Sequence, residues 1–294
     1  MTVEFIRTAT MDGLLLEGAF TPSVGHLMLP VDACLFLHGT GDNFYSRGVL
    51  EACAGAAQAD GLATLRVNTR GHDGICSLPG RRGSAFGGAA FEKISECNYD
   101  VSAWLDWLAS RGLKRVALVG HSMGAVKAIY SQAHAPHAAV RAILAASPPR
   151  FEHAWFQQHA KGEKFREDFA RAQELVAAGQ GESLIRVTQP LPYIASAASY
   201  VEKYGPEDHY DFVPLLAKLK VPMLLLVGEL SEQSSPAFDQ TLSGVAKIQD
   251  TLPLVTAERV PGADVAYRGQ LDAPWVRFAG WLKKNTAKLP SQST

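Results

Sequence analysis

The chain lacks any apolar run of the roughly 20 residues needed to cross a bilayer; its longest, around residues 221–227, has the length of a strand. The N-terminal segment MTVEFIRTATMDG has no basic stretch followed by an apolar one, so we expect neither a signal peptide nor a membrane partner. An excess of one charge is also missing, since 28 Lys and Arg against 29 Asp and Glu give a formal net charge of −1. This balance gives no electrostatic reason to expect binding to nucleic acid.

Cysteine is scarce, and the common cofactor motifs are absent from the sequence. The four cysteines (Cys34, Cys53, Cys76 and Cys97) form no CxxC pair and show no metal-ligand spacing with histidine, so we expect reduced thiols in a cytoplasmic protein. There is no GxGxxG, Walker loop, zinc motif or EF-hand, and we therefore expect no cofactor and no metal. With 47% hydrophobic and 19% charged residues, the 294-residue chain has the composition of a folded protein. Nothing in it indicates an oligomeric state.

Short aliphatic runs alternate with amphipathic segments along most of the chain. Eight runs are predicted as strands, at residues 3–7, 14–20, 33–37, 63–68, 116–119, 142–145, 223–227 and 257–260. The middle runs lack strict polar alternation, which is typical of parallel strands covered on both faces, whereas the first two are expected to pair antiparallel. Helices are predicted over residues 47–59, 98–111, 123–135, 212–219 and 273–283. This order predicts a mostly parallel sheet flanked by helices.

Two segments interrupt the alternation. Residues 70–88 are rich in glycine and are predicted as a mobile loop. Residues 148–206 show no clear buried strand and combine charged helical pieces with several tyrosines. We interpret residues 148–206 as a helical lid over the carboxyl ends of the strands, inserted between core segments 1–147 and 207–294. The alternative is a helical excursion with no role at a site.

The pentapeptide GHSMG at residues 120–124 matches the GxSxG pattern of a nucleophile elbow. An apolar strand is predicted before it and a helix after it, which is the context that gives the motif weight. Glycines at the flanks allow a tight turn that holds the Ser122 hydroxyl clear of the sheet. The backbone N–H of Met123 then lies at a helix N-terminus, where it can stabilise a developing oxyanion.

A second motif agrees with this interpretation. The predicted strand at residues 33–37 runs into His38-Gly39-Thr40-Gly41. An HG pair after an early strand is where the other oxyanion donor is expected, here the backbone N–H of Thr40. We interpret His38 as a residue that orients the loop rather than as a catalytic one.

In these motifs the chain resembles the α/β-hydrolase superfamily, and the resemblance covers nearly the whole length. HGTG follows the third strand, NTRGHDG (residues 68–74) follows the fourth, and GHSMG follows the fifth. The resemblance implies an α/β-hydrolase fold, with a mostly parallel eight-stranded sheet flanked by helices and a helical lid. Within the superfamily the chain is most similar to the bacterial esterase and serine-aminopeptidase branch.

The resemblance implies a catalytic triad in the order serine, acid, histidine, with the acid in a GxxD pattern after the next-to-last strand. Here that strand is followed by GELSE at residues 228–232, so Ser231 stands where aspartate is expected. Glu232 lies one residue further on and is preferred over Glu229 at the strand end. Glu152 is a third candidate. The alternative for each is a solvated loop carboxylate.

The position of the triad histidine departs further from the family pattern. The resemblance implies a segment such as GADH, whereas residues 262–265 read GADV and no histidine follows His209. Without a base, a serine hydroxyl is a poor nucleophile at neutral pH. Three explanations for Val265 stay open. His209, His153 or His72 supplies the base; the scaffold has a non-hydrolytic role; or Val265 is a substitution in an otherwise complete enzyme.

Two functions are compatible with these motifs. The first is a serine hydrolase in which Ser122 attacks a small ester, thioester or amide, with the N–H groups of Thr40 and Met123 as oxyanion donors. The second is a catalytically impaired or non-hydrolytic protein of the same fold that binds a small molecule, and its motive is Val265.

Overall fold

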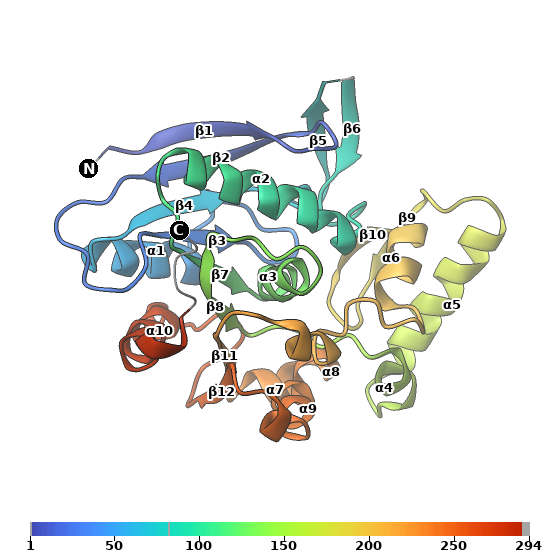
Figure 1. The fold of residues 1–294 in the computed structure, drawn as a ribbon. Helices are drawn as coiled ribbons and strands as arrows, with labels where there is room; N and C mark the ends of the chain where they lie inside the picture. The colour runs from blue at the N-terminus through green and yellow to red at the C-terminus, as the bar shows by residue number, and fades with distance from the viewer. Residues whose placement is uncertain (1, 82, 290–294) are drawn as a thin grey trace.

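The protein is described by a computed structural model that covers residues 2–81 and 83–289. Its centre is an eight-stranded sheet in the order β1-β2-β4-β3-β7-β8-β11-β12 (Figure 1). The strands are β1 (Glu4–Ala9), β2 (Leu15–Thr21), β3 (Ala33–Leu37), β4 (Ala63–Val67), β7 (Val116–His121), β8 (Val140–Ala146), β11 (Met223–Gly228) and β12 (Val255–Val260). All eight strands predicted from the sequence are present, and the α/β-hydrolase fold is confirmed.

The sheet is antiparallel at one edge and parallel elsewhere, as the pattern of polar alternation predicted. Strand β2 pairs antiparallel with both β1 and β4, and every pairing from β4 to β12 is parallel. The carboxyl ends of the parallel strands therefore meet along one edge of the sheet, where ligand sites of open α/β sheets are found.

Helices cover both faces of the sheet and enclose two hydrophobic cores. Helices α2 (Cys97–Ser110) and α3 (Met123–His134) lie on one face, and α1 (Val49–Ala59) and α10 (Ala273–Lys284) lie on the other (Figure 1). Neighbouring residues of β3 belong to different cores, Leu35 to the one with Trp104 and Phe36 to the one with Trp275. This division follows from the two-residue period of a strand.

Shorter helices complete the core segments. They are α7 (Ser231–Ser234), α8 (Pro236–Asp239) and α9 (Thr241–Ala246), with single 3-10 turns at Ile94–Glu96, Gln249–Thr251 and Thr286–Lys288. The α-helix predicted over residues 212–219 was wrong in type, because the segment is a 3-10 helix at Pro214–Lys218 that begins with proline. None of the described helices combines the length and the apolar composition that spanning a bilayer requires.

The glycine-rich segment after β4 forms a hairpin rather than a featureless loop. Strands β5 (Cys76–Gly80) and β6 (Gly83–Gly87) pair antiparallel and stand at the β1–β2 end of the molecule (Figure 1). An isolated bridge between Leu14 and Gly80 ties the hairpin to the β1–β2 turn. The backbone pairing was not visible in the sequence because glycine and proline occupy positions that strands usually fill with β-branched residues.

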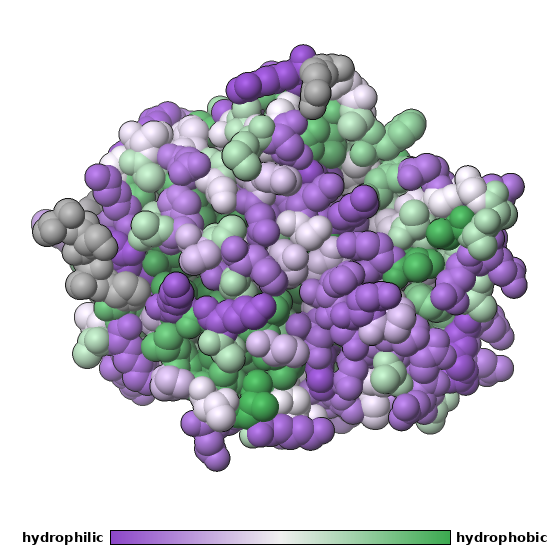
Figure 2. All heavy atoms as spheres, turned by 45° about the vertical axis from the view of Figure 1, so that its right-hand side comes forward, coloured by the Kyte–Doolittle hydropathy of each residue, from purple (hydrophilic) through white to green (hydrophobic). Residues whose placement is uncertain are grey.

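The 148–206 segment was predicted to be helical, but it also contains two short strands. Helices α4 (His153–Gln158), α5 (Glu163–Ala177) and α6 (Ala197–Tyr204) are joined by a two-stranded sheet of β9 (Leu184–Val187) and β10 (Tyr193–Ser196). Aromatic side chains pack these helices together: Phe156, Phe165, Phe169, Tyr200 and Tyr204. The outer surface of this part of the molecule is mainly hydrophilic (Figure 2).

Candidate active site

Ser122 occupies a sharp turn between β7 and α3. Its backbone has φ 53° and ψ −122°, a conformation that L-residues rarely adopt, and its side chain is partly exposed. The flanking glycines are needed for close approach rather than for φ: a Cβ on Gly120 would overlap the backbone of Gly124, and a Cβ on Gly124 would overlap the carbonyl of Leu37. The Ser122 N–H donates to the Ala146 carbonyl oxygen of the neighbouring strand at 2.8 Å.

The loop after β3 lies directly against this turn. A Cβ built on Gly39 would lie 3.2 Å from Ser122 Cβ and 3.7 Å from Ser122 Oγ, so the absence of a side chain lets the two loops meet. Among the described residues, neither the Thr40 N–H nor the Met123 N–H donates a hydrogen bond to a protein acceptor. The Thr40 hydroxyl oxygen is also buried without a partner in the part of the chain that is described. Buried polar groups of this kind are normally satisfied, in the free or the bound state.

His38 is a buried, neutral residue that organises this loop. Its Nδ1–H donates to the Gly39 carbonyl at 2.8 Å, and its Nε2 accepts the Thr69 N–H at 3.1 Å. Burial, with the nearby charge of Lys127, lowers the pKa of His38 to about 4. Both ring nitrogens are therefore occupied, as the interpretation of His38 as a loop-orienting residue requires.

A buried ion pair stabilises the loop that carries His38, through Thr69. Lys127, one turn into α3, contacts Glu92 Oε1 at 2.5 Å and donates to Thr69 Oγ1 at 2.8 Å. Burial alone would raise the pKa of Glu92, but the charges of Lys127 and Lys203 lower it below its ordinary value. This pair was not predicted from the sequence; the available signal was a lysine among otherwise apolar residues and glycine at positions 123–129.

Val265 lies in the loop after β12 and is partly buried against the hydrophobic core. Its carbonyl oxygen accepts a hydrogen bond from His121 Nε2 at 2.6 Å. Burial lowers the pKa of His121, so this imidazole is neutral and donates from Nε2. The imidazole that contacts the loop thus comes from the residue before Ser122, and its donor is already engaged.

The predicted acids all have partners other than a histidine. Glu229 Oε2 accepts the Gly262 N–H at 2.8 Å, and Glu232 pairs with Arg259 at 2.8 Å. Glu152 pairs with Arg150 at 2.9 Å.

Ser231, at the position where the family places its acid, begins α7 and is fully buried. Its hydroxyl oxygen has no hydrogen-bond partner among the described residues. The positions at which the resemblance places the acid and the histidine, 231 and 265, therefore hold side chains that can act neither as a carboxylate nor as a base.

None of the three alternative histidines hydrogen-bonds to Ser122 in the part of the chain that is described. The His153 ring packs against Phe169, and its Nδ1–H donates to the Tyr204 carbonyl at 2.7 Å. His209 is exposed beside Tyr210. His72 is engaged by residues of its own loop.

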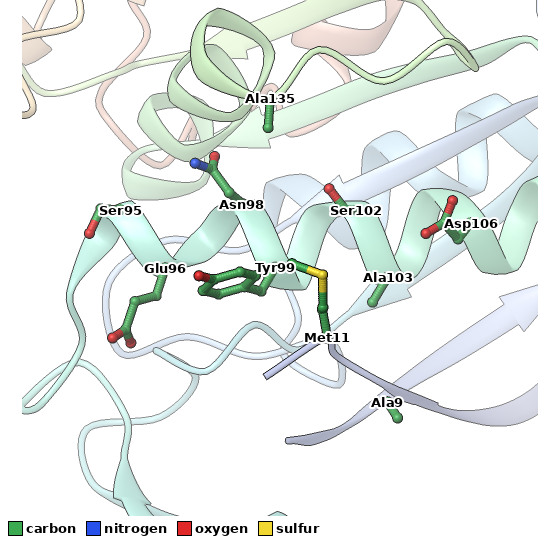
Figure 3. Close-up of a pocket in the computed structure, with 10 residues that line it drawn as sticks. All are labelled: Ala9, Met11, Ser95, Glu96, Asn98, Tyr99, Ser102, Ala103, Asp106 and Ala135. Carbon is green, nitrogen blue, oxygen red and sulfur yellow. The ribbon is translucent and has the colours of Figure 1, made fainter. Parts of the chain in front are cut away.

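One cavity of the structure lies apart from this turn. It has a volume of about 750 Å³ and lies along α2, lined by Met11 at the β1–β2 turn and by Asn98, Tyr99 and Asp106 among others (Figure 3). It contains none of the predicted site residues. A smaller cavity of about 280 Å³ is lined by His121 and Ala266, and so adjoins the loop that carries Val265.

Comparison with known proteins agrees with this fold. A family profile described as "Alpha/beta hydrolase family" matches residues 34–281, and the chain belongs to that family. A search of curated proteins finds no match.

Solved structures with the same architecture include the alpha/beta hydrolase GrgF from a Penicillium species, with a TM-score of 0.70 at 14% identity, covering 98% of this chain and 100% of that one. Est1E from Butyrivibrio proteoclasticus with bound ferulic acid has a TM-score of 0.68 at 15% identity. The match covers 96% of this chain and 99% of that one. An esterase from Pyrococcus furiosus has a TM-score of 0.61 at 15% identity, and the match covers 97% of this chain and 90% of that one. At these identities the likeness shows the fold.

Substitution of Gly124 by alanine tests the close approach at the turn. Because the added Cβ would overlap the Leu37 carbonyl, we expect Gly124→Ala to lower the free energy of unfolding by about 1–3 kcal/mol or more. Gly280→Ala is the matched control, since Gly280 lies in α10 with open space around it and should gain up to about 1 kcal/mol. Urea unfolding of both variants measures the difference; equal effects would contradict the account.

Proposed function

We propose that the protein is a serine hydrolase that acts on a small ester, thioester or amide, with Ser122 as the nucleophile. The observation that carries the proposal is the backbone of Ser122, at φ 53° between β7 and α3 with the Gly39 loop against it. A strained residue at such a turn is retained when its side chain has a task there. Membership of the alpha/beta hydrolase family supports a hydrolytic reaction.

In the proposed reaction Ser122 Oγ attacks the carbonyl carbon of the substrate, the bond from that carbon to the leaving group breaks, and the leaving group departs with the proton that Ser122 gives up. The developing negative charge on the carbonyl oxygen is stabilised by the N–H groups of Thr40 and Met123, which have no other protein acceptor among the described residues. Water then attacks the acyl group and releases Ser122. The preset donors require no rearrangement during the reaction, which is the main advantage of such a site.

The weak part of the proposed site is the acceptor for the Ser122 proton. No imidazole stands at position 265, and among the described residues no histidine, His121 included, forms a hydrogen bond with the Ser122 hydroxyl. General-base assistance contributes about 10²- to 10⁴-fold in rate, so turnover is expected to be slow and to favour substrates with good leaving groups. Activated esters such as p-nitrophenyl esters are therefore the substrates of choice for detecting activity.

The second candidate is a protein of the same fold that binds a small molecule without hydrolysing it. The observation that favours it is that position 231 holds no acid and position 265 holds no histidine. Ser231 is buried and Val265 packs against the core. A protein of this fold that binds a ligand without hydrolysing it needs neither an acid nor a histidine at these two positions.

Labelling with a fluorophosphonate separates these two functions. If Ser122 is an accessible nucleophile beside two oxyanion donors, we expect one equivalent of label, located on Ser122 by peptide mapping, and hydrolysis of p-nitrophenyl acetate above the buffer rate. Ser122→Ala should lose both. Ser243→Ala, a variant of an exposed serine in α9, is the control and should retain both. An unlabelled, inactive native protein would reject the hydrolase and leave the binding protein.

Restoring the two triad positions tests what limits turnover. We expect Ser231→Asp combined with Val265→His to raise kcat/KM for p-nitrophenyl esters by about a hundredfold or more, because a general base is supplied together with the carboxylate that orients it. Val276→His, at an exposed position of α10, is the matched control and should change nothing. An unchanged rate in a folded double variant would mean that the missing base is not the limiting defect.

A further inference from the structure

The loop after β4 brings a thiol, an imidazole and a carboxylate into one chain of hydrogen bonds. Cys76 Sγ lies 3.5 Å from His72 Nε2, and His72 Nδ1 lies 2.8 Å from Asp73 Oδ2. Asp73 has φ 59°, a left-handed conformation, and its N–H donates to the Asp42 carbonyl oxygen. The order of groups is nucleophile, base and acid, the same order that the family builds with serine, histidine and aspartate.

The hydrogen bonds of Asp73 determine which nitrogen of the His72 ring carries the hydrogen. Asp73 also accepts from Asn43 Nδ2 at 2.7 Å and from the Tyr45 hydroxyl at 3.0 Å. Burial alone would raise the pKa of Asp73, but these donors and His72 lower it below its ordinary value. An ionised carboxylate accepts a hydrogen bond from Nδ1–H, which leaves Nε2 as an acceptor that faces the thiol.

Cys76 differs from the other cysteines in accessibility. Cys34, Cys53 and Cys97 are buried, whereas Cys76 is partly exposed at the start of β5. Burial, with the negative charge of Asp73 and Glu92, raises the pKa of the Cys76 thiol to about 11. The resting thiol is therefore protonated at neutral pH, and it needs a neighbouring base in order to react.

We propose that Cys76 is a modification site for low-molecular-weight disulfides, with His72 as its general base and Asp73 as the residue that positions the imidazole. Cys76 Sγ attacks one sulfur of the disulfide as its proton passes to His72 Nε2. The disulfide bond breaks, a new bond forms between Cys76 and that sulfur, and the departing thiolate takes the proton from His72. Cys76 is oxidised, and the departing half of the reagent is reduced to a thiol.

The charges near Cys76 favour transfer of its proton to His72 during the attack over a thiolate in the resting protein. Asp73 and Glu92 are the charged groups that act on the thiol, and both are negative. They oppose a thiolate and stabilise the imidazolium that forms while the proton is held. The proposed thiol chemistry takes place on another loop, and so it does not depend on hydrolysis at Ser122.

The rate of reaction with dipyridyl disulfide as a function of pH tests the proposal. We expect the native protein to release one equivalent of pyridinethione, with the adduct mapped to Cys76. Between about pH 6 and 10 the rate should level off instead of rising throughout, because a neighbouring base removes the thiol proton. A thiol acting alone would instead react about tenfold faster per pH unit up to about pH 11.

Variants complete the experiment. His72→Gln should slow the reaction near neutral pH by about tenfold or more and abolish the level region of the profile. Asp73→Asn, which keeps a hydrogen-bond acceptor, should give an intermediate rate. His134→Gln, an exposed histidine on α3, is the control and should match the native protein. Adducts on the other cysteines, no adduct on the folded protein, or one profile shared by native and His72→Gln proteins would overturn the proposal.

Discussion

The structure depends on one close approach between main chains. Gly124 at the start of α3 lies so near the carbonyl of Leu37 that no side chain fits between them, and Gly39 makes a less severe approach to Ser122, where an added Cβ would lie 3.2 Å from Ser122 Cβ. This contact brings the end of β3 and the turn after β7 together at the carboxyl edge of the sheet. The strained backbone at Ser122 and the position of the Thr40 amide both follow from it. The strain is stable because the surrounding elements determine the turn from several sides.

The candidate site has two parts, the loop that carries Thr40 and the region around Ser231 and Val265, and different interactions stabilise them. Next to the loop that carries Gly39 and Thr40, a connected buried network is formed by His38, Thr69, Lys127 and Glu92, and such groups are costly to bury unless they are paired. On the opposite side, around Ser231 and Val265, the structure offers a buried hydroxyl and an aliphatic side chain. With Thr40 and Met123 as the proposed oxyanion donors and no histidine at position 265, the proposed site stabilises an oxyanion better than it activates a nucleophile. The proposed slow turnover on activated esters follows from this imbalance.

The parts of the fold that rest on local pattern were predictable from the sequence. Eight aliphatic runs became strands, and GxSxG between a strand and a helix marked the turn at Ser122 because its glycines are required there. The β5–β6 hairpin was not predicted because glycine, serine and proline give it little strand propensity. The β9–β10 hairpin was not predicted because each of its strands has only four residues, too few for a clear periodic pattern. Contacts between distant segments, such as His121 with Val265 and Lys127 with Glu92, are set by tertiary packing and leave no periodic signal. The Cys76 and His72 contact depends on a left-handed residue between them, which the sequence alone does not reveal.

The most direct test of the central claim is a crystal structure of the protein after reaction with a phosphonate ester that mimics the tetrahedral intermediate. We expect a covalent bond to Ser122 Oγ and a phosphonyl oxygen within about 2.7–3.1 Å of the N atoms of both Thr40 and Met123. We also expect that no imidazole approaches Ser122 in the adduct. A phosphonyl oxygen turned away from those two amides, or a histidine moved into contact with Ser122, would contradict the claim.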